Sequence, residues 1–194
     1  MASRLEVIND GLVRLGVPPL ASLSDQSAQA LAADSIYTTI SDAALSEHPW
    51  SFAYREKRLP KLSLDTEDLR ASDFEYVYQL PTDYLRVLGL RSYYFYQLAG
   101  DQMYSNDEEA QVVYVARVPE STWPAYFAKL ISFQFAAAVA ITLTEQTSRA
   151  ELMFTLADQQ RRMARSIDSL QTPPHVFNLM RIYTQRTNNP LAQG

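Results

Sequence analysis

Residues 123–145 read WPAYFAKLISFQFAAAVAITLTE, and the choice between fold classes rests on them. Pro124 suits the first turn of a helix, and Ser121 or Thr122 can cap it. A helix that is apolar nearly all round must be enclosed by other helices or by a neighbouring subunit. We therefore predict a long, buried helix that reaches about Glu145. Its apolar residues are Phe127, Leu130, Ile131, Phe133, Phe135, Ala137, Ala138 and Ile141.

Three further helices are expected on either side of a central segment. Residues 3–15 repeat Leu and Ile at helical spacing and stop at Gly16. A second helix should run from a cap at Ser24 or Asp25 to about Leu45, because the residue before Pro49 is disfavoured in a helix. A fourth should extend from 147 to about Leu170.

The hydrophobic period changes between residues 50 and 118. Trp50, Phe52 and Tyr54 alternate with smaller or polar residues, which is typical of a half-buried strand. Similar patterns at 74–78, 87–96, 102–105 and 111–118 predict about five to seven short strands in all.

Together these segments predict an α+β fold. We expect a four-helix bundle with an inserted antiparallel β domain and an extended C-terminal arm. The bundle comprises residues 1–49 and 119–170, the β domain 50–118 and the arm 171–194.

The predicted arm carries more apolar surface than a disordered tail usually does. It has two arginines and no acid, whereas the first fifty residues have two basic and six acidic side chains. We therefore predict that the arm becomes ordered when it binds a partner. The residues expected to make that contact are Val176, Phe177, Leu179, Met180, Arg181, Ile182 and Tyr183.

Composition excludes several classes of protein. The 194 residues contain no cysteine, so disulfides and thiolate metal sites are ruled out. The net charge of −5 argues against a dedicated nucleic-acid binder. The N-terminal residues lack the apolar run of a signal peptide, and the apolar stretch 131–143 is too short to span a bilayer, so we expect no membrane association.

Catalytic and metal-binding patterns are weak. His48 and His175 are isolated, and the acidic stretches 65–68 and 107–109 lack the glycine of a calcium loop. We therefore expect no enzyme activity, no cofactor and no metal.

Two groups of residues suggest contacts with other proteins. Tyrosine is enriched at interfaces, and Tyr93, Tyr94 and Tyr96 fall in one aromatic run that we expect on both faces of a strand. The apolar third helix and the basic fourth helix are expected to join identical copies. The residues expected at that subunit interface are Phe127, Ile131, Phe135, Arg161, Arg162 and Arg165.

Four stretches carry a resemblance to a known family. They are VINDGLVRLGVPPL at 7–20, SLSD at 22–25, HPWSF at 48–52 and LPTDYL at 80–85. In this order and spacing the chain resembles the tail tubular protein A family, the head-to-tail adaptors of short-tailed bacteriophages. The resemblance extends over most of residues 5–170.

The resemblance implies a structural protein of the virion tail, assembled in the host cytoplasm. Such adaptors form a ring of twelve copies beneath the portal protein and carry the tail nozzle and tail fibre proteins. The resemblance also implies that DNA passes through the lumen without sequence-specific binding, which fits an acidic ring. By position, the arm 173–194 would contact the portal, and Tyr93, Tyr94 and Tyr96 would contact tail proteins.

Three other functions remain open from the sequence. A tail-associated cell-wall hydrolase would use a pair of carboxylates and would act on peptidoglycan. A connector or completion protein of a long-tailed phage would be a smaller helical bundle with less β structure. A cellular ligand-binding protein would have a closed apolar pocket and would be a stable monomer.

Overall fold

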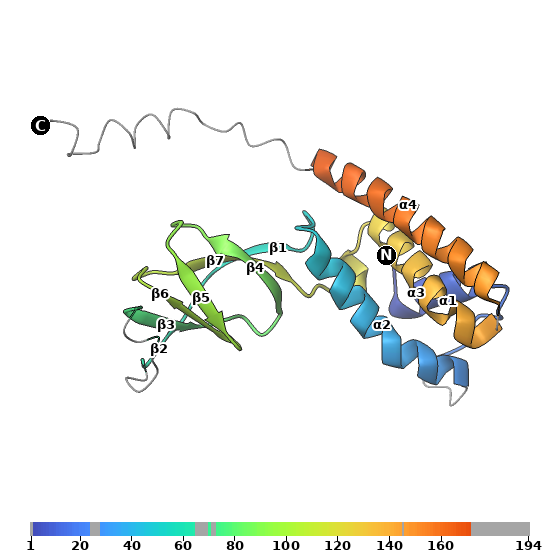
Figure 1. The fold of residues 1–194 in the computed structure, drawn as a ribbon, viewed down its shortest axis with the longest axis horizontal. Coiled ribbons are helices and arrows are strands. Elements are labelled where there is room, and N and C mark those ends of the chain that lie inside the picture. The colour runs from blue at the N-terminus through green and yellow to red at the C-terminus, as the bar shows by residue number, and fades with distance from the viewer. Residues whose placement is uncertain (1, 24–27, 65–69, 71–72, 145, 172–194) are drawn as a thin grey trace, which may run out of the picture.

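The computed structural model describes residues 2–23, 28–64, 70, 73–144 and 146–171. Within these ranges it is an α+β protein, with the helices gathered on one side and the strands on the other (Figure 1). The predicted C-terminal arm, 171–194, lies outside the described residues apart from Gln171.

Four α-helices form the helical part. They are α1 (Arg4–Arg14), α2 (Ala28–Glu47), α3 (Ala125–Thr144) and α4 (Thr147–Gln171), and a short 3₁₀ helix, η2 (Glu120–Thr122), precedes α3. The start of α1 is fixed by a capping box, in which the Ser3 hydroxyl accepts the Glu6 N–H and the Glu6 carboxylate accepts the Ser3 N–H. The predicted first, third and fourth helices are confirmed to within a few residues.

The predicted four-helix bundle with an inserted β domain is wrong. The substantial helix–helix contacts among the described residues all involve α3, because α1, α2 and α4 each pack on α3 far more than on one another. A bundle instead has a shared interior to which every helix contributes one apolar stripe. Here α3 itself occupies the centre, and Figure 1 shows it between α4 and α2.

By length and composition alone, α3 is also apolar enough to cross a membrane, and half of its most apolar window is buried inside the protein. Phe127, Leu130, Ile131 and Phe135 have no exposed surface at all. Burial on this scale is typical of a core helix, which is what the sequence predicts.

The strands between α2 and α3 form two antiparallel sheets in the described part of the chain. One has three strands in the order β1 (Tyr54–Arg58), β7 (Gln111–Ala116) and β4 (Tyr84–Leu90). The other has the order β2 (Lys61–Leu62), β3 (Tyr76–Gln79), β6 (Gln102–Ser105) and β5 (Tyr96–Ala99).

Two strand predictions are wrong. Residues 50–53 form a turn between α2 and β1, although Trp50 is buried as the alternation suggested. Residues 91–95 form a loop between β4 and β5, so Tyr93 and Tyr94 do not lie on a strand. Tyr93 has a positive φ of 62° there, a conformation that a strand excludes.

The contact between α1 and α3 depends on Gly11. A Cβ atom added at this position would lie 2.8 Å from Phe135 Cδ1 and 2.9 Å from the Ser132 carbonyl oxygen. The neighbouring Asp10 carboxylate accepts the Ser132 hydroxyl at 2.5 Å, which holds the two helices at this separation. Any side chain at position 11 must therefore push α1 away from α3.

Gly11→Ala should lower the free energy of unfolding by about 1–3 kcal/mol, because overpacking outweighs the helix propensity gained. Urea denaturation followed by circular dichroism measures the change. Val13→Ala, on the exposed side of the same helix, is the matched control and should shift stability by less than about 0.5 kcal/mol. A Gly11→Ala variant as stable as the parent protein would contradict the close approach.

Candidate interaction surfaces

Helix α4 has a buried face that packs on α3. The buried residues recur every three or four positions, as a helix with one covered face requires. They are Ala150, Met153, Ala157, Gln160, Ala164 and Asp168. The rest of α4 divides into two flanks and an outer polar side.

One flank, which we call the arginine flank, consists of Arg161, Arg162, Arg165 and Phe154. Arg165 Nη2 lies 2.7 Å from a Glu47 carboxylate oxygen and Arg161 Nε lies 3.4 Å from the other, so both arginines join α4 to the end of α2. Arg162 pairs with Asp158 on its own helix at 3.1 Å. Phe154 precedes Arg161 by two helical turns and is 58% exposed.

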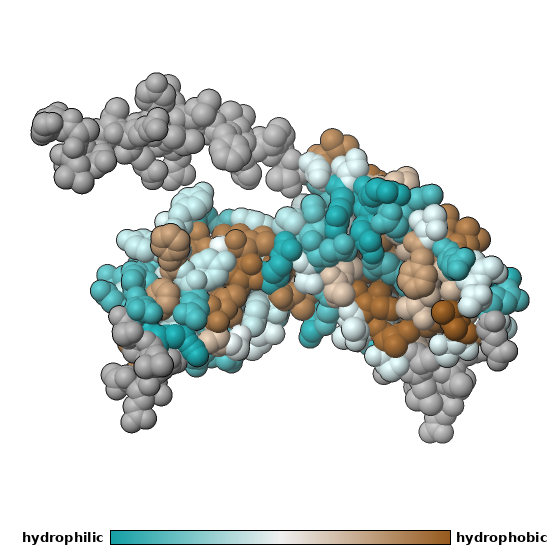
Figure 2. Space-filling model, in the orientation of Figure 1, coloured by the Kyte–Doolittle hydropathy of each residue, from teal (hydrophilic) through white to brown (hydrophobic). Residues whose placement is uncertain are grey.

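These contacts change the role expected of the arginines. Arg161 and Arg165 are engaged within the subunit. Within the part of the chain that the structure describes, Arg162, with 71% of its side chain exposed, pairs only with Asp158 of its own helix. Figure 2 shows the resulting band of hydrophilic residues over α4, with a hydrophobic area on the helical part below it.

The second flank of α4, which we call the apolar flank, lies almost opposite Phe154. Residues two apart on a helix point about 200° away from each other, so Leu152 and Phe154 face different sides. The flank residues follow at intervals of four, seven, four and three positions. They are Leu152, Leu156, Met163, Ile167 and Leu170, and all but the half-buried Leu156 are exposed. Leu170 is 82% exposed.

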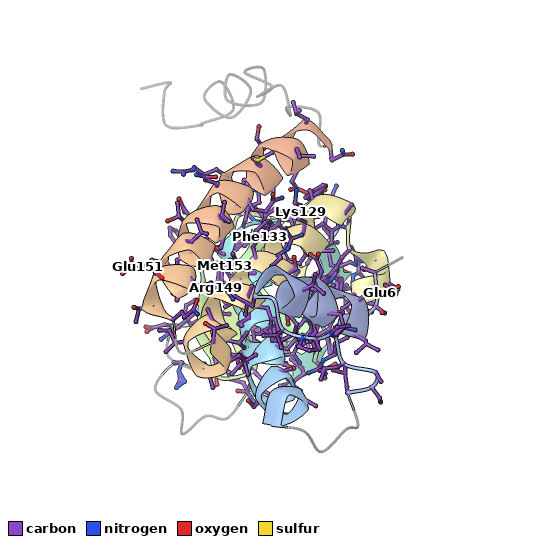
Figure 3. The ribbon with its side chains drawn as sticks, turned by 90° about the vertical axis from the view of Figure 1, so that its right-hand side faces the viewer. Glu6, Lys129, Phe133, Arg149, Glu151 and Met153 are labelled. Carbon is purple, nitrogen blue, oxygen red and sulfur yellow. The ribbon has the colours of Figure 1, made fainter. Side chains whose placement is uncertain are left out.

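Figure 3 views the helical part from its free end, where Lys129 and Phe133 of α3 lie between α1 and α4. The Arg14 guanidinium stacks on the Phe133 ring at 4.1 Å, and a shallow groove of about 530 Å³ runs between α1 and α3 beside them. At the same end, the Arg149 Nη1 donates a 2.6 Å hydrogen bond to the Leu15 carbonyl, which ties the start of α4 to the end of α1.

The third surface is the loop 91–95, which presents aromatic rings to solvent. Tyr93 is 86%, Tyr94 53% and Phe95 91% exposed. The loop is anchored at both ends, since the Ser92 hydroxyl bonds the buried Asp107 carboxylate and the Ser105 hydroxyl donates to the Phe95 carbonyl at 3.0 Å. The loop backbone is thus fixed at both ends, and the three rings extend from it into solvent. The predicted contact residue Tyr96 begins β5 and is half-buried.

The three core residues predicted for the subunit interface are not available for it. Phe127, Ile131 and Phe135 are completely enclosed within the subunit. Phe127 contacts Trp50 and Trp123 at ring-centroid distances of 5.0 Å, and Phe135 packs edge-on against Tyr37. Their predicted role does not hold, because a second copy cannot reach them. The predicted portal-binding residues, Val176 to Tyr183, lie outside the described residues.

The arrangement closest to a catalytic site surrounds Asp168. This buried carboxylate accepts the Ser51 hydroxyl at 2.7 Å, the Ser51 N–H at 3.0 Å and the Tyr126 hydroxyl at 2.7 Å. His48 Nε2 lies 3.7 Å away. In a hydrolytic triad the serine bonds the histidine, which in turn bonds the acid. Here the serine donates directly to the acid, so the cluster joins α4 to α3 and to the turn after α2.

The surroundings of Asp168 shift the pKa of two neighbouring groups. Burial lowers the pKa of His48 from its usual 6.5, with Arg165 and Arg86 acting in the same direction and Asp168 opposing them. Burial, and then the hydrogen bond to Asp168, raises the pKa of Tyr126 well above its usual value. Both groups are therefore neutral at pH 7. Among the described residues, no group of three or more His, Cys, Asp or Glu side chains is placed to hold a metal ion.

Comparison with known proteins does not assign the chain to a family. No protein-family model matches the chain, and no curated protein matches it.

The apolar flank is the feature that the sequence interpretation missed. Its spacing of four, seven, four and three residues is present in residues 152–170, but the prediction for this helix uses only its arginines.

Proposed function

We propose that the chain is a structural virion protein, a head-to-tail adaptor that forms a ring under the portal, extends the DNA channel and carries the tail nozzle and fibres. One observation supports this most strongly. Helix α4 exposes a row of apolar side chains on one flank and Phe154 among the arginines of the nearly opposite flank, while its third face is buried on α3. A ring requires this property, because each subunit uses a different patch toward each neighbour.

The loop 91–95 gives separate support. Burial of a ring such as Phe95 contributes roughly 1.5–3 kcal/mol to an association. Tyr93 also holds a positive φ, which is unfavourable for a residue with a side chain. A fixed loop that presents three rings is suited to a protein partner, and tail proteins are the partner class that the proposal assigns to it.

Electron microscopy of the purified chain, alone and mixed with its portal protein, tests the proposal. We expect ring-shaped particles that stack on the portal, at protein concentrations high enough for the contacts to form. The proposal fails if the chain stays monomeric under all conditions and does not bind the portal. It also fails if the chain cleaves peptidoglycan and loses this activity when one carboxylate is replaced.

A further inference from the structure

From the two exposed flanks of α4 we infer how neighbouring copies of this chain meet: the apolar flank of one copy packs beside the arginine flank of the next, around Phe154. The occupant of each surface is thus a second copy of the same chain. This inference rests on the proposed function, and it names the contact within the ring.

The shape of the apolar flank favours a helical partner. From Leu152 to Leu170 the flank extends about 27 Å along α4, at the rise of a helix. Its intervals of four, seven, four and three residues are those of a seam between packed helices. The side chains that border it, Thr155, Gln159 and Ser166, are uncharged. A second helix can therefore approach without meeting a like charge.

A two-fold contact between two apolar flanks is the alternative geometry for the same occupant. That pairing would close as a dimer and would leave Phe154, which is 58% exposed, in water. A head-to-tail contact covers both flanks of every copy.

The area that one such contact can bury is small. The six apolar side chains on the two flanks offer about 500 Å² of apolar surface, at roughly 60–120 Å² each. Since about 60% of an interface is apolar, this corresponds to a total near 800–900 Å², below the roughly 1,200–2,000 Å² of a specific, stable pairwise interface. One contact alone is therefore weak, and a closed ring, in which each copy makes two, stabilises the assembly.

The absence of cysteine from the chain allows a direct cross-linking test. Glu151→Cys marks the arginine flank and Met163→Cys marks the apolar flank, and both positions are exposed. They are about 18 Å apart along α4, too far for a disulfide or a short bis-maleimide within one copy. Leu98→Cys, on β5 and 42% exposed, is the matched control.

Under conditions in which particles form, the double variant Glu151→Cys/Met163→Cys should give a ladder of covalent dimers, trimers and larger species. A mixture of the two single variants should give dimers only, and each single variant should cross-link no more than Leu98→Cys does. Met163→Glu should abolish the particles without changing the unfolding midpoint.

Three results would overturn the inference. Efficient dimers from Met163→Cys alone would show that apolar flanks face each other. Particles that form while the double variant cross-links only as well as the control would place the contact elsewhere and leave the proposed function intact. A chain that never assembles would reject the inference and the proposed function together.

Discussion

Trp50→Ala should lower the free energy of unfolding by about 3–5 kcal/mol, the cost of truncating a large buried aromatic side chain. The indole has no exposed surface. Its ring lies 5.0 Å from Phe127 and 4.8 Å from His48, and its Nε1–H donates to the Ala44 carbonyl at 2.8 Å. Truncation therefore removes packing around α3 and leaves a buried carbonyl at the end of α2 without its donor.

Equilibrium urea denaturation, followed by far-ultraviolet circular dichroism, measures this loss. Trp50→Phe is the matched control, because it keeps a ring but lacks the indole N–H. It should lose less stability than Trp50→Ala. A loss below about 1 kcal/mol for the alanine variant would mean that the ring does not occupy the core.

Trp50 also shows where sequence patterns mislead. The alternation of Trp50, Phe52 and Tyr54 predicted a strand, and two-residue periodicity is a good indicator of one. In the structure Trp50 is buried by a turn, in which the Ala53 and Tyr54 N–H groups both bond the Trp50 carbonyl. The alternating burial does not continue beyond Trp50, since Ala53 is completely buried and Tyr54 is 40% exposed. A large aromatic residue in a periodic run can therefore be buried without belonging to a strand.

The helix limits were easier to predict than the helix packing. Local chemistry fixes a limit, as the Ser3 capping box and Gly16 do for α1. Packing depends on which apolar surfaces meet, and several arrangements satisfy the same pattern. An apolar surface on all sides of α3 indicated enclosure, but it did not distinguish a shared bundle interior from a central helix with three neighbours.

The same ambiguity explains the errors in the predicted subunit interface. The predicted interface assigns the apolar surplus of α3 to a second copy, yet Trp50 and Trp123 cover Phe127 within the subunit, and Tyr37 of α2 packs on Phe135. Among the described helical residues, most of the exposed large apolar side chains are on α4 instead, although Val13 of α1 and Ile141 of α3 are exposed as well. Periodicity places them on one side of a helix, but only the fold shows that this side is left uncovered.

Asp168→Ala should lower the free energy of unfolding by about 3–5 kcal/mol. Each hydrogen bond to a charged group contributes roughly 1.5–3 kcal/mol, and buried donors left without an acceptor add a desolvation cost. Asp168 is only 3% exposed and accepts the Ser51 N–H, the Ser51 hydroxyl and the Tyr126 hydroxyl. These contacts join α4 to the turn after α2 and to α3, so their loss loosens the helical part at its connection to the strands.

Comparison of Asp168→Asn with Asp168→Ala isolates the charge, because the amide keeps the shape and one acceptor oxygen. We expect Asp168→Asn to lose less stability than Asp168→Ala. In a double-mutant cycle, Ser51→Ala and Asp168→Ala should be coupled by more than about 1 kcal/mol, since the two side chains share a hydrogen bond. Strict additivity would contradict the shared contact. Because Ser51 donates to Asp168 rather than to His48, the cycle also bears on the hydrolase alternative: a catalytic acid would change activity far more than stability, whereas a structural carboxylate changes stability first.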